Sequence, residues 1–186
     1  SIFIHALITV FVIADPFGNV PIFLSLTENM SSEERRRTIV KAVSSATLIL
    51  ILFALLGEGI LEFLNISLNS FKIAGGLLLL VIAFQMLVGS PREIEPGEEE
   101  SIAVVPMGIP LLAGPGTITS VMIFMTEAQD FLNKASVILA IILAMVGTGL
   151  IVINCDFLSK IIKKEGSRAL TKIMGIIPVS YTHLTL

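Results

Sequence analysis

The sequence predicts an all-α polytopic membrane protein with six transmembrane spans arranged as an inverted three-plus-three repeat. Hydrophobic residues make up 54% of the 186 residues, charged residues only 15%, and the mean hydropathy is +0.94, far above that of soluble domains. The apolar residues form runs long enough to cross a hydrocarbon core of ~30 Å, which takes ~20 residues of helix. Short matching segments also recur about one hundred residues apart.

Charge and cysteine content exclude several classes of protein. The net charge is −3, from 12 basic and 15 acidic residues, so the chain has no overall basic field for nucleic acid. Cys155 is the single cysteine, which rules out an intrachain disulfide, and no Cys/His cluster has metal-ligand spacing. The two histidines, His5 and His183, do not supply a nucleophile and base inside the bilayer. We therefore expect no nucleic-acid partner, no metal, no cofactor and no enzymatic activity.

The first apolar stretch, residues 2–26, is long enough to cross the bilayer, but its middle is the segment Asp15-Pro16-Phe17-Gly18-Asn19. Proline lacks a backbone N–H and interrupts a helix, and a carboxylate is costly in lipid. The sequence therefore predicts a first span made of two half-helices.

Two continuous spans follow in the first half of the chain. Ser31 to Glu34 has the spacing of a helix-capping sequence, and the arginines at 35–37 precede the second span, residues 39–61. The third span covers about residues 71–88. Within it, Gly75-Gly76 permits close packing against another helix.

The second half begins after residues 89–101, a linker with five glutamates and two prolines. The fourth span, residues 102–125, is uncharged but contains Gly114-Pro115-Gly116-Thr117, which predicts a second broken helix. The fifth span, residues 135–155, is uncharged and uninterrupted. Residues 156–168 are expected to form a basic loop.

A sixth span opens at Ala169, but its apolar pattern stops at Pro178. We expect this helix to be truncated and residues 178–186 to be a non-native tail. The start at Ser1, without a methionine, indicates that the natural terminus lies at or before this point, and no cleavable signal is visible in residues 2–26.

The duplication divides the chain into a first three-span repeat, residues 1–88, and a second, incomplete one, residues 102–177. Three pairs of segments match in preserved order: Pro16 with Pro115, Gly57-x-Gly59 with Gly147-x-Gly149, and residues 72–75 with 172–175. Because each repeat has an odd number of spans, the second copy enters the membrane in the opposite sense.

The distribution of basic residues predicts the orientation in the plasma (inner) membrane. With alternating spans, the segments 28–38, 89–101 and 156–168 share one side, and with the nearby Lys41 and Lys172 they hold ten of the twelve Lys and Arg residues. By the positive-inside rule, these three loops are cytoplasmic and the N-terminus lies outside.

The two breaks define the candidate binding site. A break at mid-membrane must be buried against protein or line a wet cavity, and two half-helix starts would direct N–H groups at the same region. That setting suits a small anionic group, and the carboxylate of Asp15 suits an ammonium, a proton or a cation, so a zwitterion would use both. The candidate substrate-binding residues are Asp15, Pro16, Gly18, Asn19, Gly114, Pro115, Gly116 and Thr117.

Structural interpretations of these residues stand beside the functional one. Asp15 before proline is a common helix start, in which the carboxylate caps backbone N–H groups. Asn19 either contacts solute or bonds the opposite break, and the glycines serve backbone geometry and close approach. The hydroxyl of Thr117 either lines the cavity or bonds its own backbone.

Residues 15–23 (Asp-Pro-Phe-Gly-Asn-Val-Pro-Ile-Phe) and 110–118 (Pro-Leu-Leu-Ala-Gly-Pro-Gly-Thr-Ile) form a pair of motifs that resembles the MarC family of six-span inner-membrane proteins, also called SnatA or UPF0056. The resemblance covers about residues 1–177 and implies an inverted architecture like that of the LysE exporter superfamily. It also implies transport of small neutral amino acids such as alanine and glycine. The positions carried over are those of the candidate site, and the departure is the incomplete sixth helix.

The expected function is therefore secondary transport of small neutral amino acids by alternating access. The alternatives are export of another small metabolite and a non-transporting role in membrane assembly. The expected partners are an amino acid solute and the lipid bilayer, with proton or sodium coupling and a small homo-oligomer as further expectations.

Overall fold

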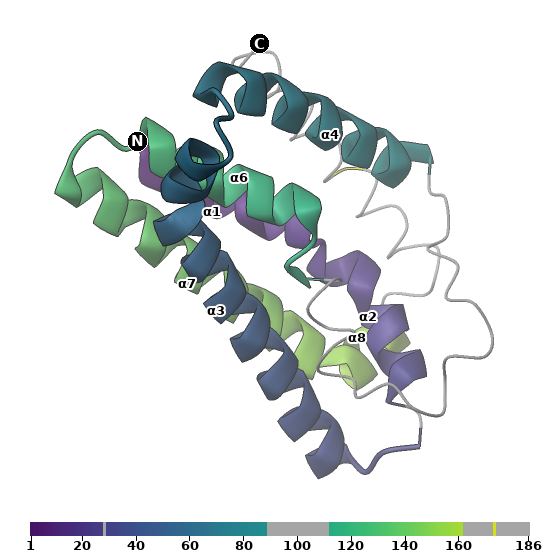
Figure 1. The fold of residues 1–186 in the computed structure, drawn as a ribbon. Helices are drawn as coiled ribbons and strands as arrows, with labels where there is room; N and C mark the ends of the chain where they lie inside the picture. Colours follow the sequence, from purple (N-terminus) through teal and green to yellow (C-terminus); the bar gives the residue numbers. More distant parts are fainter. Residues whose placement is uncertain (28, 89–111, 162–172, 174–186) are drawn as a thin grey trace.

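The structure is a computed structural model that describes residues 1–27, 29–88, 112–161 and 173 (Figure 1). Every element in this part of the chain is a helix, which confirms the all-α prediction there. The helices are α1 (Ile2–Ala14), α2 (Pro16–Leu26), α3 (Ser32–Phe63), α4 (Leu68–Val88), α6 (Pro115–Glu127), α7 (Phe131–Ile153) and α8 (Cys155–Ile161).

The first span is divided as predicted. α1 ends at Ala14, α2 begins at Pro16, and Asp15 between them has left-handed torsion angles, φ 43° and ψ 63°. Together they form one apolar stretch, Ile2–Leu24, that is long enough to cross a membrane. The interruption therefore lies inside a membrane-spanning element.

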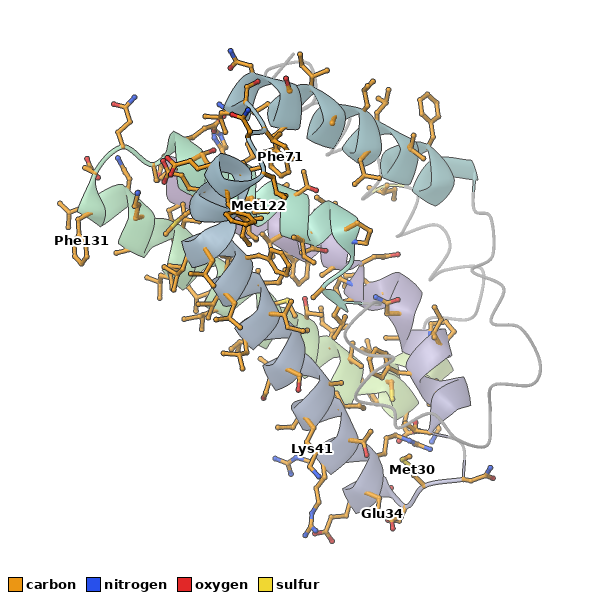
Figure 2. The ribbon with its side chains drawn as sticks, in the orientation of Figure 1. Met30, Glu34, Lys41, Phe71, Met122 and Phe131 are labelled. Carbon is orange, nitrogen blue, oxygen red and sulfur yellow. The ribbon has the colours of Figure 1, made fainter. Side chains whose placement is uncertain are left out.

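The start of α3 confirms the predicted capping sequence. The side-chain oxygen of Ser31 accepts a hydrogen bond from the backbone N–H of Glu34, while the Glu34 carboxylate accepts from the backbone N–H of Ser31 at 2.9 Å. This reciprocal pair satisfies donors that a helix start leaves without partners. Charged side chains such as Glu34 and Lys41 gather at this end of the helix (Figure 2).

The predicted basic loop at 156–168 is wrong in its first part, because α8 occupies Cys155–Ile161. Cys155 is buried and Leu158 packs against the core, three residues apart and so on one helix face. The charges at Asp156 and Lys160 obscured this short apolar period in the sequence. Residues 162–168 lie outside the described residues.

Three helical stretches of the described chain are long and apolar enough to span a membrane: Ile2–Leu24, Ser32–Phe63 and Phe131–Ile153. α4 supplies a further apolar helix of 21 residues. Residues 89–111, which include the linker and the first part of the fourth span, lie outside the described residues, as do the sixth span except Ile173 and the tail. The six-span inverted arrangement therefore stays a prediction.

The helices pack around α1, which contacts α6 and α7, while α3 crosses both of these partners (Figure 1). α2 contacts α7 and α8, and α4 contacts α6. The core contains many alanines, which let membrane helices approach closely. The fully or almost fully buried ones are Ala6, Ala14, Ala42, Ala46, Ala54, Ala113, Ala128, Ala140 and Ala144.

Two glycines show how close this approach is. A Cβ atom at Gly75 of α4 would collide with Cγ2 of Thr119 on α6, which confirms the predicted packing role of Gly75. A Cβ atom at Gly57 of α3 would lie 2.8 Å from Cγ and Cε of Met122. Figure 2 shows Met122 where α6 meets α3. α6 is thus held from two sides.

Candidate functional site

Asp15 lies at the first break, and its side chain bonds the start of the helix that follows. The Asp15 carboxylate oxygen Oδ1 accepts a hydrogen bond from the backbone N–H of Gly18 at 3.1 Å, so Asp15 caps α2. Pro16 follows at a position where no donor is needed. The capping interpretation of Asp15 is confirmed, and because its side chain is only half-buried, capping leaves a direct role in binding open to test.

Asn19 ties the two half-helices together. Its side chain is 2% exposed, and its Nδ2 donates to the carbonyl oxygen of Ala14, the last residue of α1, at 2.7 Å. Its backbone N–H donates to the carbonyl oxygen of Asp15 at 3.0 Å. The interpretation that Asn19 bonds the opposite break is therefore wrong, because the amide satisfies a carbonyl of its own break instead.

At the predicted second break, the described residues show a helix start built from glycine and proline. Gly114 is the N-cap of α6 and Pro115 its first residue, which confirms a helix start at the predicted position. The torsion angles of Gly114, φ −72° and ψ 172°, are open to any L-residue, so backbone geometry does not require glycine there. Thr117 Oγ1 donates to the carbonyl oxygen of Leu112 at 3.2 Å, which confirms the structural interpretation of this hydroxyl.

The start of α6 lies beside the break between α1 and α2, since α6 packs along α1 and runs in the opposite direction (Figure 1). The predicted site residues therefore come from two segments that are distant in sequence and near in space. The hydrogen bonds described at each break stay within that break. The eight residues range from buried (Pro16, Asn19, Gly116, Thr117) through half-buried (Asp15, Gly18, Gly114) to exposed (Pro115).

One buried hydroxyl near the breaks was missed by sequence reasoning. Thr9 of α1 is 3% exposed, and in the described part of the chain its Oγ1 has no hydrogen-bond partner. Ser and Thr in membrane helices usually bond their own backbone, so nothing in the sequence distinguishes Thr9 from Thr148, whose hydroxyl donates to Ala144. Only the structure shows that the Thr148 hydroxyl has a partner and that the Thr9 hydroxyl has none among the described residues.

Ion pairs at both ends of the bundle were also missed. At one end, Arg35 Nη1 lies 2.5 Å from Asp156 Oδ1, and Arg35 Nη2 donates to the carbonyl oxygen of Thr27 at 3.0 Å. These contacts join the end of α2, the start of α3 and α8. The other end has two pairs: Lys72 with Glu127 at 3.2 Å, and Lys134 with Glu58 at 3.8 Å. In the sequence, only the basic members of these pairs carry a signal, that of membrane topology.

No cluster of three or more His, Cys, Asp or Glu side chains that could hold a metal occurs within the described ranges. The polar groups that the structure brings together are one carboxylate, two helix starts, an amide and several hydroxyls. Such a set can bind a small polar solute through hydrogen bonds and charge.

Comparison with known proteins supports a membrane role. A family model described as "MarC family integral membrane protein" matches residues 1–181. A UPF0056 membrane protein of Methanocaldococcus jannaschii is 45% identical over 182 residues, covering 94% of this chain and 89% of that protein. The UPF0056 inner membrane protein YhgN of Escherichia coli is 32% identical over 180 residues, covering 95% and 89%. No solved structure is detectably similar to the chain. The chain therefore belongs to the MarC family of integral membrane proteins.

Proposed function

We propose that the protein is a secondary transporter of small neutral amino acids that works by alternating access at the two helix breaks. The observation that carries this proposal is Asp15, a carboxylate at an interruption inside a membrane-spanning stretch, beside the start of a second half-helix. Ionisable groups within the membrane are costly, and in transporters they mark the solute or ion path.

The chemistry of the breaks favours a zwitterion. The Asp15 carboxylate attracts an ammonium group, and the N-terminal ends of α2 and α6 carry partial positive charge that attracts a carboxylate. The second break has no carboxylate of its own, so the two halves of the site differ in charge. An amino acid with a small side chain uses both kinds of group, and Asp15 is also the group that would bind a coupling proton or sodium ion.

The packing of the helices supports an inverted repeat as the framework for this motion. α1, from the first repeat, packs against α7 of the second, and α6, from the second repeat, packs against α3 of the first. These are the reciprocal contacts that a pseudo-two-fold axis in the membrane plane would produce. Rocking of one repeat against the other would expose the breaks to each side in turn.

We place the Arg35 end of the bundle in the cytoplasm and the N-terminus outside, in the plasma (inner) membrane. Supporting this placement, Arg35, Arg36, Arg37 and Lys41 all lie on the first turns of α3, at the same end as α8. The E. coli relative is called an inner membrane protein, which fits this location.

Flux measurements test the proposal. The purified protein in liposomes should take up labelled alanine or glycine, with and without a pH or sodium gradient. Asp15→Asn should lower this uptake at least tenfold, because asparagine keeps the capping oxygen and tolerates left-handed torsion angles but loses the charge.

Asp130→Asn is the matched control. Asp130 Oδ1 accepts from the backbone N–H of Asn133 at 2.7 Å at the exposed start of α7, so this variant also removes charge from a capping carboxylate. It should transport normally. Normal uptake by Asp15→Asn would refute the role of Asp15. Flux of a different solute class in a competition panel would favour metabolite export, and no flux of any solute would favour an assembly role.

A further inference from the structure

Several hydroxyls in or directly after the described helices bond their own backbone. Five of them donate to the carbonyl oxygen four residues earlier, at distances of 2.6–2.9 Å: Thr27, Thr47, Ser120, Ser136 and Thr148. This is the usual way for a hydroxyl in an apolar environment to satisfy its hydrogen. Thr9 departs from this pattern.

The Thr9 hydroxyl is buried without a protein partner, as judged over the residues that the structure describes. The carbonyl of His5, four residues earlier, is the acceptor that the pattern would use, but the structure has no such bond. A buried polar group without a partner costs free energy, and such groups call for a specific explanation. The interior around Thr9 thus offers one donor that the protein itself does not use.

The position of Thr9 places this donor near the breaks. Thr9 shares the buried face of α1 with Ala6, Val10 and Ile13, at helical spacing, and this helix packs against α6 and α7. It precedes Asp15 by six residues, about 9 Å along the axis at ~1.5 Å per residue. A small zwitterion held by one hydrogen bond of ~2.8 Å at each end reaches across a separation of this order.

The neighbouring surface of α6 supplies further polar groups. α6 runs beside α1 in the opposite direction, with its start next to the break (Figure 1), and its first turns carry the buried residues Thr117, Thr119 and Ser120. The hydroxyls of Thr117 and Ser120 already donate to the backbone, so their oxygens act toward a solute only as acceptors. Among the described residues, Thr9 carries the one fully buried hydroxyl oxygen without a partner, which leaves it as a donor for an anionic group.

We propose that the Thr9 hydroxyl donates a hydrogen bond to the carboxylate of the transported solute, while Asp15 binds its ammonium group. This inference rests on the proposed transport function and adds to it a residue that determines specificity. It assigns the two ends of the solute to two points on α1, one at the break and one about two turns before it.

The experiment compares Thr9→Val with Thr148→Val in liposomes, measuring the half-saturating concentration of alanine uptake. Both changes replace a buried hydroxyl by a methyl group of the same shape, but only Thr148 has a backbone acceptor. Thr9→Val should raise the half-saturating concentration about tenfold, and Thr148→Val should change it less than twofold. Thr9→Ser, which restores the hydroxyl, should bring the value back toward that of the original protein.

Thermal unfolding in detergent provides the second readout. Because the Thr9 hydroxyl has no partner to lose, Thr9→Val should unfold at the same or a higher temperature. A lower unfolding temperature would show that the hydroxyl supports the fold and would overturn the inference. Unchanged half-saturation in Thr9→Val, or an equal change in Thr148→Val, would overturn it while leaving transport intact. Absence of uptake by the original protein would overturn both proposals.

Discussion

The first helix break and the helix start at the predicted second break are stabilised in different ways. At the first, side chains of the break itself make the bonds: Asp15 caps Gly18, and Asn19 satisfies the carbonyl of Ala14. At the second, the turn is glycine and proline, and the helix that follows is fixed by close contacts from neighbouring helices, through Gly75 and Gly57.

The first break is therefore stabilised by bonds between residues close in sequence, and the start of α6 by contacts with residues distant in sequence. Asp15 has a left-handed φ of 43°, which costs most L-residues free energy, whereas Gly114 has ordinary extended torsion angles. The first break therefore combines strain, burial and charge in one short segment, as functional sites commonly do. The second supplies a helix start in a rigid packing environment.

Asn19→Leu should have the largest effect on stability. It removes the bond from Nδ2 and leaves the Ala14 carbonyl without its donor in a buried position, so the free energy of unfolding should fall by about 3 kcal/mol. Denaturant unfolding in detergent micelles measures this change. A loss below ~1 kcal/mol would mean that the two half-helices are joined by something other than this amide.

Gly75→Ala should have the second largest effect and lower the free energy of unfolding by about 2 kcal/mol. The new Cβ atom would collide with Thr119 and force α4 away from α6. Gly59→Ala is the matched control: its Cβ would meet nothing within 4 Å, and alanine favours the helix. The control should be as stable as the original protein or more so. Equal losses in the two variants would argue against packing as the support of the second break.

Asp15→Ala should lower the free energy of unfolding by about 1–2 kcal/mol, because alanine cannot accept the hydrogen bond from Gly18 and does not readily adopt left-handed torsion angles. Asp15→Asn should cost less than ~0.5 kcal/mol, since asparagine does both. The same unfolding assay measures the pair. If Asp15→Asn were as unstable as Asp15→Ala, the charge itself would be stabilising the fold, and the flux assay could no longer separate function from structure.

Gly114→Ala should have the smallest effect, below ~0.5 kcal/mol from the backbone, because φ −72° suits alanine. Thr117→Val at the same break should cost about 1 kcal/mol through loss of its bond to Leu112. Thermal unfolding of both variants is a sufficient measurement. A larger loss at Gly114 would indicate that a neighbouring group approaches its Cα too closely for a side chain.

Sequence reasoning located the first break and the starts of α2, α3 and α6 because these features are local. Proline removes a donor and glycine or aspartate caps the next helix, so Pro16 and Pro115 mark their positions without help from the rest of the chain. The capping pair of Ser31 and Glu34 is equally local. The short helix α8 was not predicted because it has only seven residues and its charges, Asp156 and Lys160, resemble those of a loop.

The sequence alone determined that this chain is a helical membrane protein with a carboxylate at an interrupted span, because hydropathy, helix length and proline chemistry act over a few residues. The tertiary structure decided which groups find partners. Arg35 pairs with Asp156, 121 residues away in the sequence, and Asn19 donates to a carbonyl of its own break. The Thr9 hydroxyl has no acceptor among the residues that the structure describes. Such pairings depend on how the helices cross in three dimensions, and the sequence pattern of single helices does not determine that geometry.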